Sequence, residues 1–141
     1  MSRLLEWLKD PSQGAKFDVQ YVDVPALSMP AEAVGGFRPL LRVSRELSTY
    51  PEWFQCFVWA HEVCHIKERH WLWVLATLVG CAPLLLVVVP YLERRADRAA
   101  SRWLTVRQVV AATALLHRPG LKQRWLYGTP AQRARHAGCD V

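Results

Sequence analysis

The chain of 141 residues lacks several patterns that identify common classes of small protein. Its four cysteines include no CxxC pair, which excludes a zinc ribbon and a thioredoxin-type redox motif. We interpret these cysteines as reduced thiols in a cytoplasmic setting. The N-terminal residues have no long apolar core and no small-residue cleavage site, so we expect no secretory signal there. The cysteines are Cys56, Cys64, Cys81 and Cys139.

Acidic residues are scarce in the last third of the chain. Residues 93–141 carry 10 Lys/Arg against 3 Asp/Glu, whereas residues 1–92 carry 8 against 9. A basic segment of this kind can meet anionic lipid or nucleic acid, or it can be a solvated helix face. Because no helix-turn-helix, RRM or zinc-finger pattern accompanies it, we expect no nucleic-acid partner.

We predict one α+β domain over residues 1–141 that is mostly helical, with a short β-sheet over about residues 17–44. Residues 17–21 alternate apolar and polar side chains, as a half-buried strand does. Residues 37–44 form the second predicted strand, in which Leu41 and Val43 share one face.

Capping signals predict where the helices begin. Thr49 and Glu52 fit a capping box, and the helix that follows is apolar nearly all round, which predicts burial. Thr105 and Gln108 fit a second box, opening a helix that ends near Pro119. Thr129, before Pro130, predicts a short helix in the basic tail. A short amphipathic helix is predicted over residues 3–9, and the basic tail spans residues 121–141.

The buried helix carries the motif that points to chemistry. His61-Glu62-Val63-Cys64-His65 matches HExxH, in which the two histidines lie one turn apart on one helix face. They can bind one zinc ion, and Glu62 then sits beside the open coordination position as the general base. The alternative is a helix whose His and Glu are merely hydrogen-bonded. Burying unpaired polar groups is costly, which favours the metal.

A third ligand is expected downstream, where Glu93 and Asp97 are spaced i and i+4 at the predicted start of a helix. One carboxylate can bind the zinc, and the other can accept the second N–H of a ligand histidine. The alternative is that both are solvated charges among arginines.

Both motifs resemble a known group of enzymes. HEVCHIKERH (residues 61–70) and ERRADRAA (residues 93–100) are similar to the membrane-associated gluzincins, the HtpX-like and CAAX-prenyl-protease-like metallopeptidases. GGFRPLLRVSRELS also resembles the stretch before HExxH in these proteins and in BlaR-type sensor peptidases. The resemblance implies a minimal zincin-like domain with one zinc per chain. It implies that His61, His65 and Glu93 bind the metal, that Glu62 is the base and that Asp97 supports a ligand.

The resemblance carries two further implications. The strand over residues 38–44 would be the edge strand along which a substrate backbone lies, and His70 has counterparts in the family but is not interpreted as a ligand. Relatives often carry a His-Pro near the end, where this chain has Thr129-Pro130 after a glycine. The group that stabilises the oxyanion is therefore unassigned. The edge-strand residues are Arg38, Leu40, Leu41, Arg42 and Val43, and the oxyanion candidates are His117, Tyr127 and His136.

Residues 71–92 contain no charged side chain. This segment of 22 residues is long enough to cross a bilayer as a straight helix. Ligands before and after this run must meet at one ion, so we predict a hairpin that turns at Gly80–Pro83. Each arm is too short to cross about 30 Å of hydrocarbon. Either the hairpin dips into one leaflet, or it packs against the helix over residues 105–117 or against a partner. In the first case Trp71, Trp73 and Tyr91 lie at the interface, and Lys67, Arg69, Arg94, Arg95 and Arg98 lie on the cytoplasmic side.

The predicted function is that of a zinc endopeptidase acting on peptide or protein substrates. The predicted location is the cytoplasmic side of a membrane, and the alternative is that the protein is soluble in the cytoplasm. The alternative function is a catalytically silent, zinc-stabilised membrane or assembly protein. Glu62 favours catalysis, because a structural zinc site has no need of it, whereas the missing tail histidine favours the silent protein. Cys139 or Asp140 in the tail could also reach the zinc and block it.

Overall fold

The computed structural model describes Arg3, Glu6 and residues 17–23, 30–116 and 129–138. Within them the fold is mostly helical with a small three-stranded sheet, which confirms the predicted α+β class. Several predictions lie outside the described residues. These are the helix over residues 3–9 apart from Arg3 and Glu6, which are helical, the helix end near Pro119, and the roles suggested for His117, Tyr127, Cys139 and Asp140.

The sheet has the strand order β1-β3-β2. Strands β1 (Asp18–Val22) and β3 (Leu40–Ser44) pair in parallel, and both lie where the sequence predicts strands. Strand β2 (Ala31–Val34) pairs antiparallel with β3 on the other side. The four-residue β2 follows a proline-rich stretch and was not predicted.

The extra strand overturns one prediction. Because β3 is hydrogen-bonded on both sides, its backbone has no free edge, and it cannot be the strand along which a substrate lies. The edge role predicted for Arg38, Leu40, Leu41, Arg42 and Val43 is therefore wrong. The edge position next to the HExxH helix belongs to β2. Leu41 and Val43 do share a buried face, as predicted.

The HExxH helix is α2 (Glu52–Lys67), and most of it is buried, as predicted. The capping box is not formed. Pro51 occupies the N-cap, whereas Thr49 ends the 3₁₀ helix η2 (Arg45–Thr49) and donates its hydroxyl to the Glu46 carbonyl at 2.7 Å. Glu52 is already the first helical residue, so the helix starts two residues later than that motif requires.

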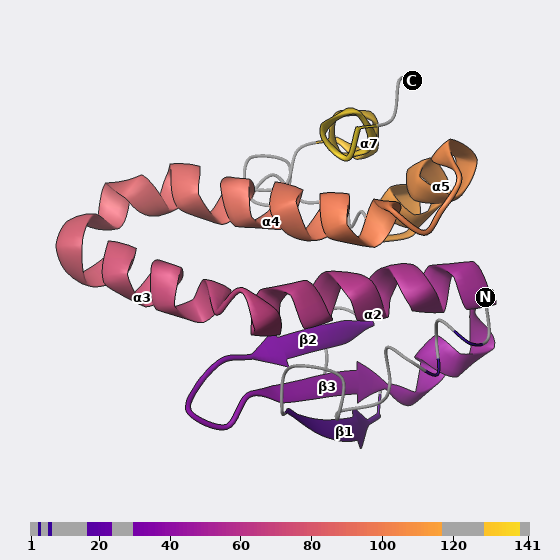
Figure 1. The fold of residues 1–141 in the computed structure, drawn as a ribbon, viewed down its shortest axis with the longest axis horizontal. Helices are drawn as coiled ribbons and strands as arrows, with labels where there is room; N and C mark the ends of the chain where they lie inside the picture. Colours follow the sequence, from indigo (N-terminus) through magenta and orange to yellow (C-terminus); the bar gives the residue numbers. More distant parts are fainter. Residues whose placement is uncertain (1–2, 4–5, 7–16, 24–29, 117–128, 139–141) are drawn as a thin grey trace.

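After α2 the chain forms a hairpin. Helix α3 (His70–Cys81) leads into the 3₁₀ helix η3 (Ala82–Leu84), where the chain reverses, and α4 (Leu85–Ser101) returns (Figure 1). Helix α4 begins at Leu85 and continues through Pro90, so Glu93 lies within it rather than at its start, which corrects the prediction. This long return helix packs alongside α2 and carries Glu93 back to the histidines.

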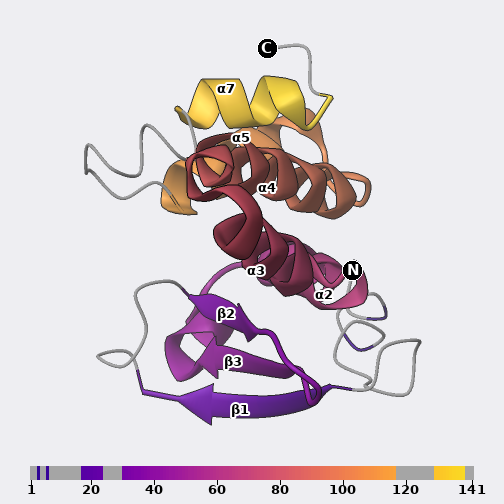
Figure 2. The same ribbon diagram turned by 90° about the vertical axis from the view of Figure 1, so that its left-hand side faces the viewer.

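Helix α5 (Val106–Leu116) and helix α7 (Pro130–His136) complete the described fold. Both predicted N-termini are confirmed: Thr105 pairs reciprocally with Gln108, and Thr129 with Gln132. Figure 2 shows the resulting layers, with the sheet below α2, then α4 and α5, and α7 outermost. The C-terminal helix therefore lies on the far side of α4 from the sheet.

The hairpin extends beyond the sheet (Figure 1). By length and composition, the helical stretch His70–Ser101 could cross a membrane, and none of its most apolar window is buried. Among the described residues, the apolar part of the hairpin is therefore not buried against the helix over residues 105–117, which was one of the two predicted arrangements. The exposed large apolar side chains of the hairpin are Leu72, Trp73, Leu75, Leu78, Val79, Leu84, Leu86, Val87 and Tyr91.

Candidate metal centre

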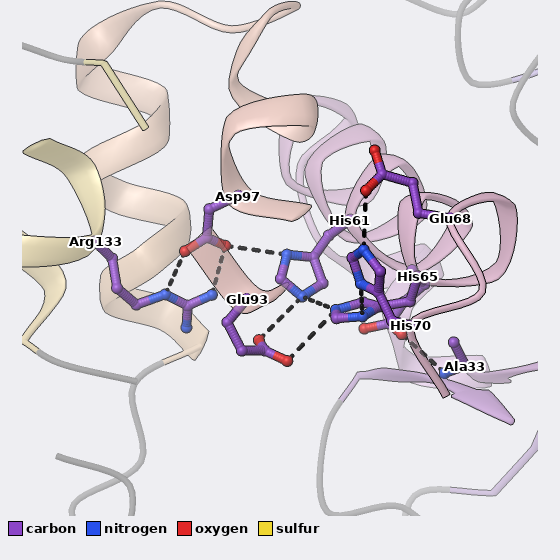
Figure 3. A network of polar contacts seen from close by, with 9 residues as sticks. Ala33, His61, His65, Glu68, His70, Glu93, Asp97 and Arg133 are labelled. Atoms are coloured by element: carbon purple, nitrogen blue, oxygen red, sulfur yellow. Dashed lines mark hydrogen bonds and ion pairs between the residues drawn. The ribbon is translucent and has the colours of Figure 1, made fainter. Parts of the chain in front are cut away.

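Three side chains from two helices converge on one point (Figure 3). Nε2 of His61 lies 3.1 Å from Nε2 of His65. Oε2 of Glu93 lies 3.4 Å from the first nitrogen, and Oε1 of Glu93 lies 3.4 Å from the second. Zinc bound to nitrogen and oxygen at 2.0–2.2 Å in a tetrahedron separates neighbouring ligand atoms by about 3.3 Å. The two nitrogens have this spacing, and the ligand atoms of His61, His65 and Glu93 all lie within 4.8 Å of one another, so the three side chains can bind one tetrahedral zinc ion and leave a fourth position open.

The other nitrogen of His61 faces a second carboxylate. Nδ1 lies 3.0 Å from Oδ1 of Asp97, within ion-pair distance, and it makes no hydrogen bond of good geometry among the described residues. Asp97 accepts two hydrogen bonds from Arg133, at 2.7 Å from Nε and 2.6 Å from Nη2. Arg133 comes from α7, so this helix holds the Asp97 carboxylate in its position next to His61.

Burial and charge set the protonation of this group. Burial alone would lower the pKa of His61, but Asp97 and Glu93 outweigh it and raise that pKa to about 10. Burial would raise the pKa of both carboxyls, yet His61 holds the pKa of Glu93 below its usual value, and His61 with Arg133 lowers that of Asp97 to about 2. The cluster favours a positive charge between the two carboxylates, which a divalent cation would supply in place of the proton.

Glu62 is buried beside the ligand atoms and is oriented by the sheet. One of its carboxylate oxygens accepts a hydrogen bond from the backbone N–H of Ala33 in β2, at 2.8 Å. Burial raises the pKa of Glu62 to about 7, because the charged carboxylate is disfavoured away from water. A carboxyl with a pKa near neutrality can both accept and return a proton.

A second chain of contacts leaves His65. Its Nδ1 lies 2.7 Å from Nδ1 of His70, whose Nε2 lies 3.0 Å from Glu68. Arg95 pairs with both oxygens of Glu68, at 2.7 and 2.9 Å. Burial lowers the pKa of His65 to about 3, so without a metal this ring stays neutral.

A cavity of about 460 Å³ opens at the ligand atoms and continues along the hairpin. On one side it is lined by β2, including Ala31 and Ala33, and on the other by the ligand set. Its far end is apolar, with Val74, Leu78 and Val89. The site is thus accessible to a ligand that is polar at one end and apolar at the other.

The structure brings together the five residues singled out by the two motifs, namely His61, Glu62, His65, Glu93 and Asp97. His136 is exposed on α7 and is not among the residues described as lining the cavity. Three features were missed by sequence reasoning: Ala33 on β2, Arg133, and the chain that joins His70 to Arg95. Each depends on a contact between separate elements, and no local spacing of residues in the sequence predicts such a contact.

Comparisons with protein-family models, with curated proteins and with solved structures find no match to this chain. The functional argument therefore depends on the motif residues and on the geometry of the site.

Proposed function

We propose that the protein is a zinc-dependent metalloendopeptidase with a minimal zincin-like fold of the gluzincin type. The observation that carries the proposal is the convergence of His61, His65 and Glu93, whose ligand atoms lie within 4.8 Å of one another, in the cavity that the buried carboxyl of Glu62 also lines. A purely structural zinc site is closed by four protein ligands, whereas a catalytic one uses three and keeps an open position.

The chain's own residues have distinct tasks in this reaction. His61, His65 and Glu93 would hold a zinc ion, which would supply Lewis acidity: it would lower the pKa of a water molecule toward about 7 and polarise a carbonyl group. Glu62 removes a proton from the attacking water and then gives it to the leaving amine. The Ala33 N–H fixes the direction of the carboxylate during both transfers. Asp97, held by Arg133, orients the His61 ring.

Strand β2 is the element that can hold an extended substrate. It is an edge strand, and Ala31, Glu32 and Ala33 line the cavity. Edge strands present backbone N–H and C=O groups to which another extended segment can pair. A peptide lying along β2 would place one of its bonds beside Glu62.

The second candidate function is a catalytically silent protein that keeps zinc for stability. It is favoured by one observation: His136, the described candidate for stabilising an oxyanion, does not line the cavity. Both candidates require zinc, and they differ in whether a peptide bond is cleaved.

Metal content tests the proposal directly. Purified wild-type protein is expected to contain close to one zinc per chain by mass spectrometry of metals, and Glu93→Gln is expected to lose most of it, because a neutral amide oxygen is a weaker ligand than a carboxylate. Glu52→Gln, which changes an exposed glutamate on α2, is the matched control and should retain zinc. A folded wild type without zinc would contradict the proposal.

We also propose that the hairpin places the protein on the cytoplasmic side of a membrane. Its arms are short: the 12 residues of α3 reach about 18 Å, so the hairpin enters one leaflet rather than crossing about 30 Å. Arg69, Arg94 and Arg95 are exposed at its base, where they can meet anionic headgroups. The turn between β2 and β3, with the fully exposed Phe37, extends toward the same end of the molecule (Figure 1).

Membrane binding is expected to depend on the hairpin tip. The double variant Val79→Asp with Val87→Asp charges two side chains that are 82% and 66% exposed, and it should weaken binding to vesicles containing anionic lipid by about 10-fold or more. Co-sedimentation measures this. The control is Leu115→Asp, an exposed leucine on α5. Equal binding of wild type and the double variant would rule out the hairpin as the anchor.

A further inference from the structure

We infer that His70 is a positioning residue for the metal ligand His65, acting through a chain of hydrogen bonds that ends at Glu68 and Arg95. The inference builds on the proposed zinc site but assigns new residues to it. Metal-bound histidines usually donate their second ring N–H to a partner that fixes the tautomer and the ring orientation. Asp97 faces the second nitrogen of His61, and His70 faces that of His65 (Figure 3).

The hydrogen-bond directions are mutually consistent. With Nε2 of His65 directed at the ligand cluster, its proton is on Nδ1, which donates to Nδ1 of His70 at 2.7 Å. His70 then carries its own proton on Nε2 and donates it to Glu68 at 3.0 Å. Glu68 accepts from Arg95 through both oxygens. The chain thus leads from the partly buried His65, through the buried His70, to an exposed ion pair.

The backbone is bent in a way that makes this contact. On an unbroken helix, side chains five residues apart would point about 140° away from each other, and His65 and His70 could not meet. Arg69, between α2 and α3, adopts a left-handed conformation with φ 51° and ψ 43°. Such a conformation is unfavourable for a residue other than glycine by about 1–2 kcal/mol. It turns the first residue of α3 back toward the ligand.

A second metal site is the competing interpretation, because Cys64, Glu68 and His70 also offer clustered ligand atoms. The contacts favour positioning. Both oxygens of Glu68 already face Arg95, and both ring nitrogens of His70 have partners.

The test is zinc affinity, measured by competition with a chromophoric chelator, together with the visible absorption spectrum of the cobalt-substituted protein. His70→Ala is expected to bind zinc about 10- to 100-fold more weakly and to change the cobalt spectrum. His70→Asn keeps an acceptor near the Nδ1 position and should restore most of the affinity. Glu68→Ala should fall between the two, and His136→Ala, an exposed histidine, should match wild type.

The outcomes separate this inference from the proposed function. Wild type without zinc would remove both. Wild type with one zinc, and His70→Ala with the same affinity and cobalt spectrum, would remove only the positioning role. Two zinc ions per wild-type chain, falling to one in His70→Ala, would make His70 a ligand and overturn the inference. Melting of the metal-free proteins shows whether a variant has merely unfolded.

Discussion

Glu62→Gln is expected to bind zinc as wild type does and to lose at least about 100-fold in kcat/KM for peptide hydrolysis. Glutamine keeps an oxygen that can accept from the Ala33 N–H, so the local structure should persist. It cannot take a proton from water, and general acid–base catalysis by a positioned side chain is worth about 10²- to 10⁴-fold. The measurement is hydrolysis of a labelled unfolded protein by the zinc-loaded wild type and variant.

The matched control is Glu52→Gln, which changes an exposed glutamate on the same helix that is not among the residues described as lining the cavity. It should keep its activity within a few-fold of wild type. If Glu62→Gln retains full activity, Glu62 is not the base. If zinc-loaded wild type cleaves no substrate tested, with or without vesicles, the silent zinc protein becomes the better interpretation.

Arg133→Met is expected to lower the free energy of unfolding by about 3–5 kcal/mol. Asp97 is only 1% exposed, and Arg133 supplies two of its hydrogen bonds, so removing the guanidinium takes away one of the two cationic partners of a buried carboxylate, the other being His61. Methionine keeps most of the apolar stem, which confines the change to the charge. Urea unfolding of the metal-free protein measures it, because bound zinc would add its own stabilisation.

Two comparisons make this prediction specific. Arg135→Met changes an exposed arginine on the same helix and should alter stability by less than about 0.5 kcal/mol. Combining Arg133→Met with Asp97→Asn removes both charges, so the double variant should be less destabilised than the sum of the two single variants. A loss below about 1 kcal/mol in Arg133→Met would show that the pair contributes little to stability.

Local spacing accounts for the parts of the site that sequence reasoning anticipated. His61 and His65 lie one turn apart, as do Glu93 and Asp97, and helical geometry alone puts each pair on one face. The break predicted at Gly80–Pro83 coincides with the reversal at η3, where Pro83 lies at the start of the 3₁₀ helix. Proline lacks a backbone N–H, so it is favoured where one helical segment ends and another begins. The caps at Thr105 and Thr129 are equally local.

Local signals were wrong where neighbouring structure competed with them. Thr49 fits a capping box by spacing, but the preceding residues form η2 and use its hydroxyl within that turn. The helix of Glu93 was predicted to start at that residue, yet α4 begins at Leu85 and continues through Pro90. A proline costs a helix one hydrogen bond, and packing against α2 and α3 can outweigh that loss.

The sequence by itself determined which side chains can bind a metal and which helix faces carry them, because those properties depend on residue type and on a period of one helical turn. Tertiary structure alone decided that β2 is the edge strand at the site, that Arg133 neutralises Asp97 across 36 residues, and that His70 turns back onto His65. The physical reason is that strand order, inter-helix packing and the left-handed turn at Arg69 depend on contacts between distant segments, which leave no periodic trace in the chain.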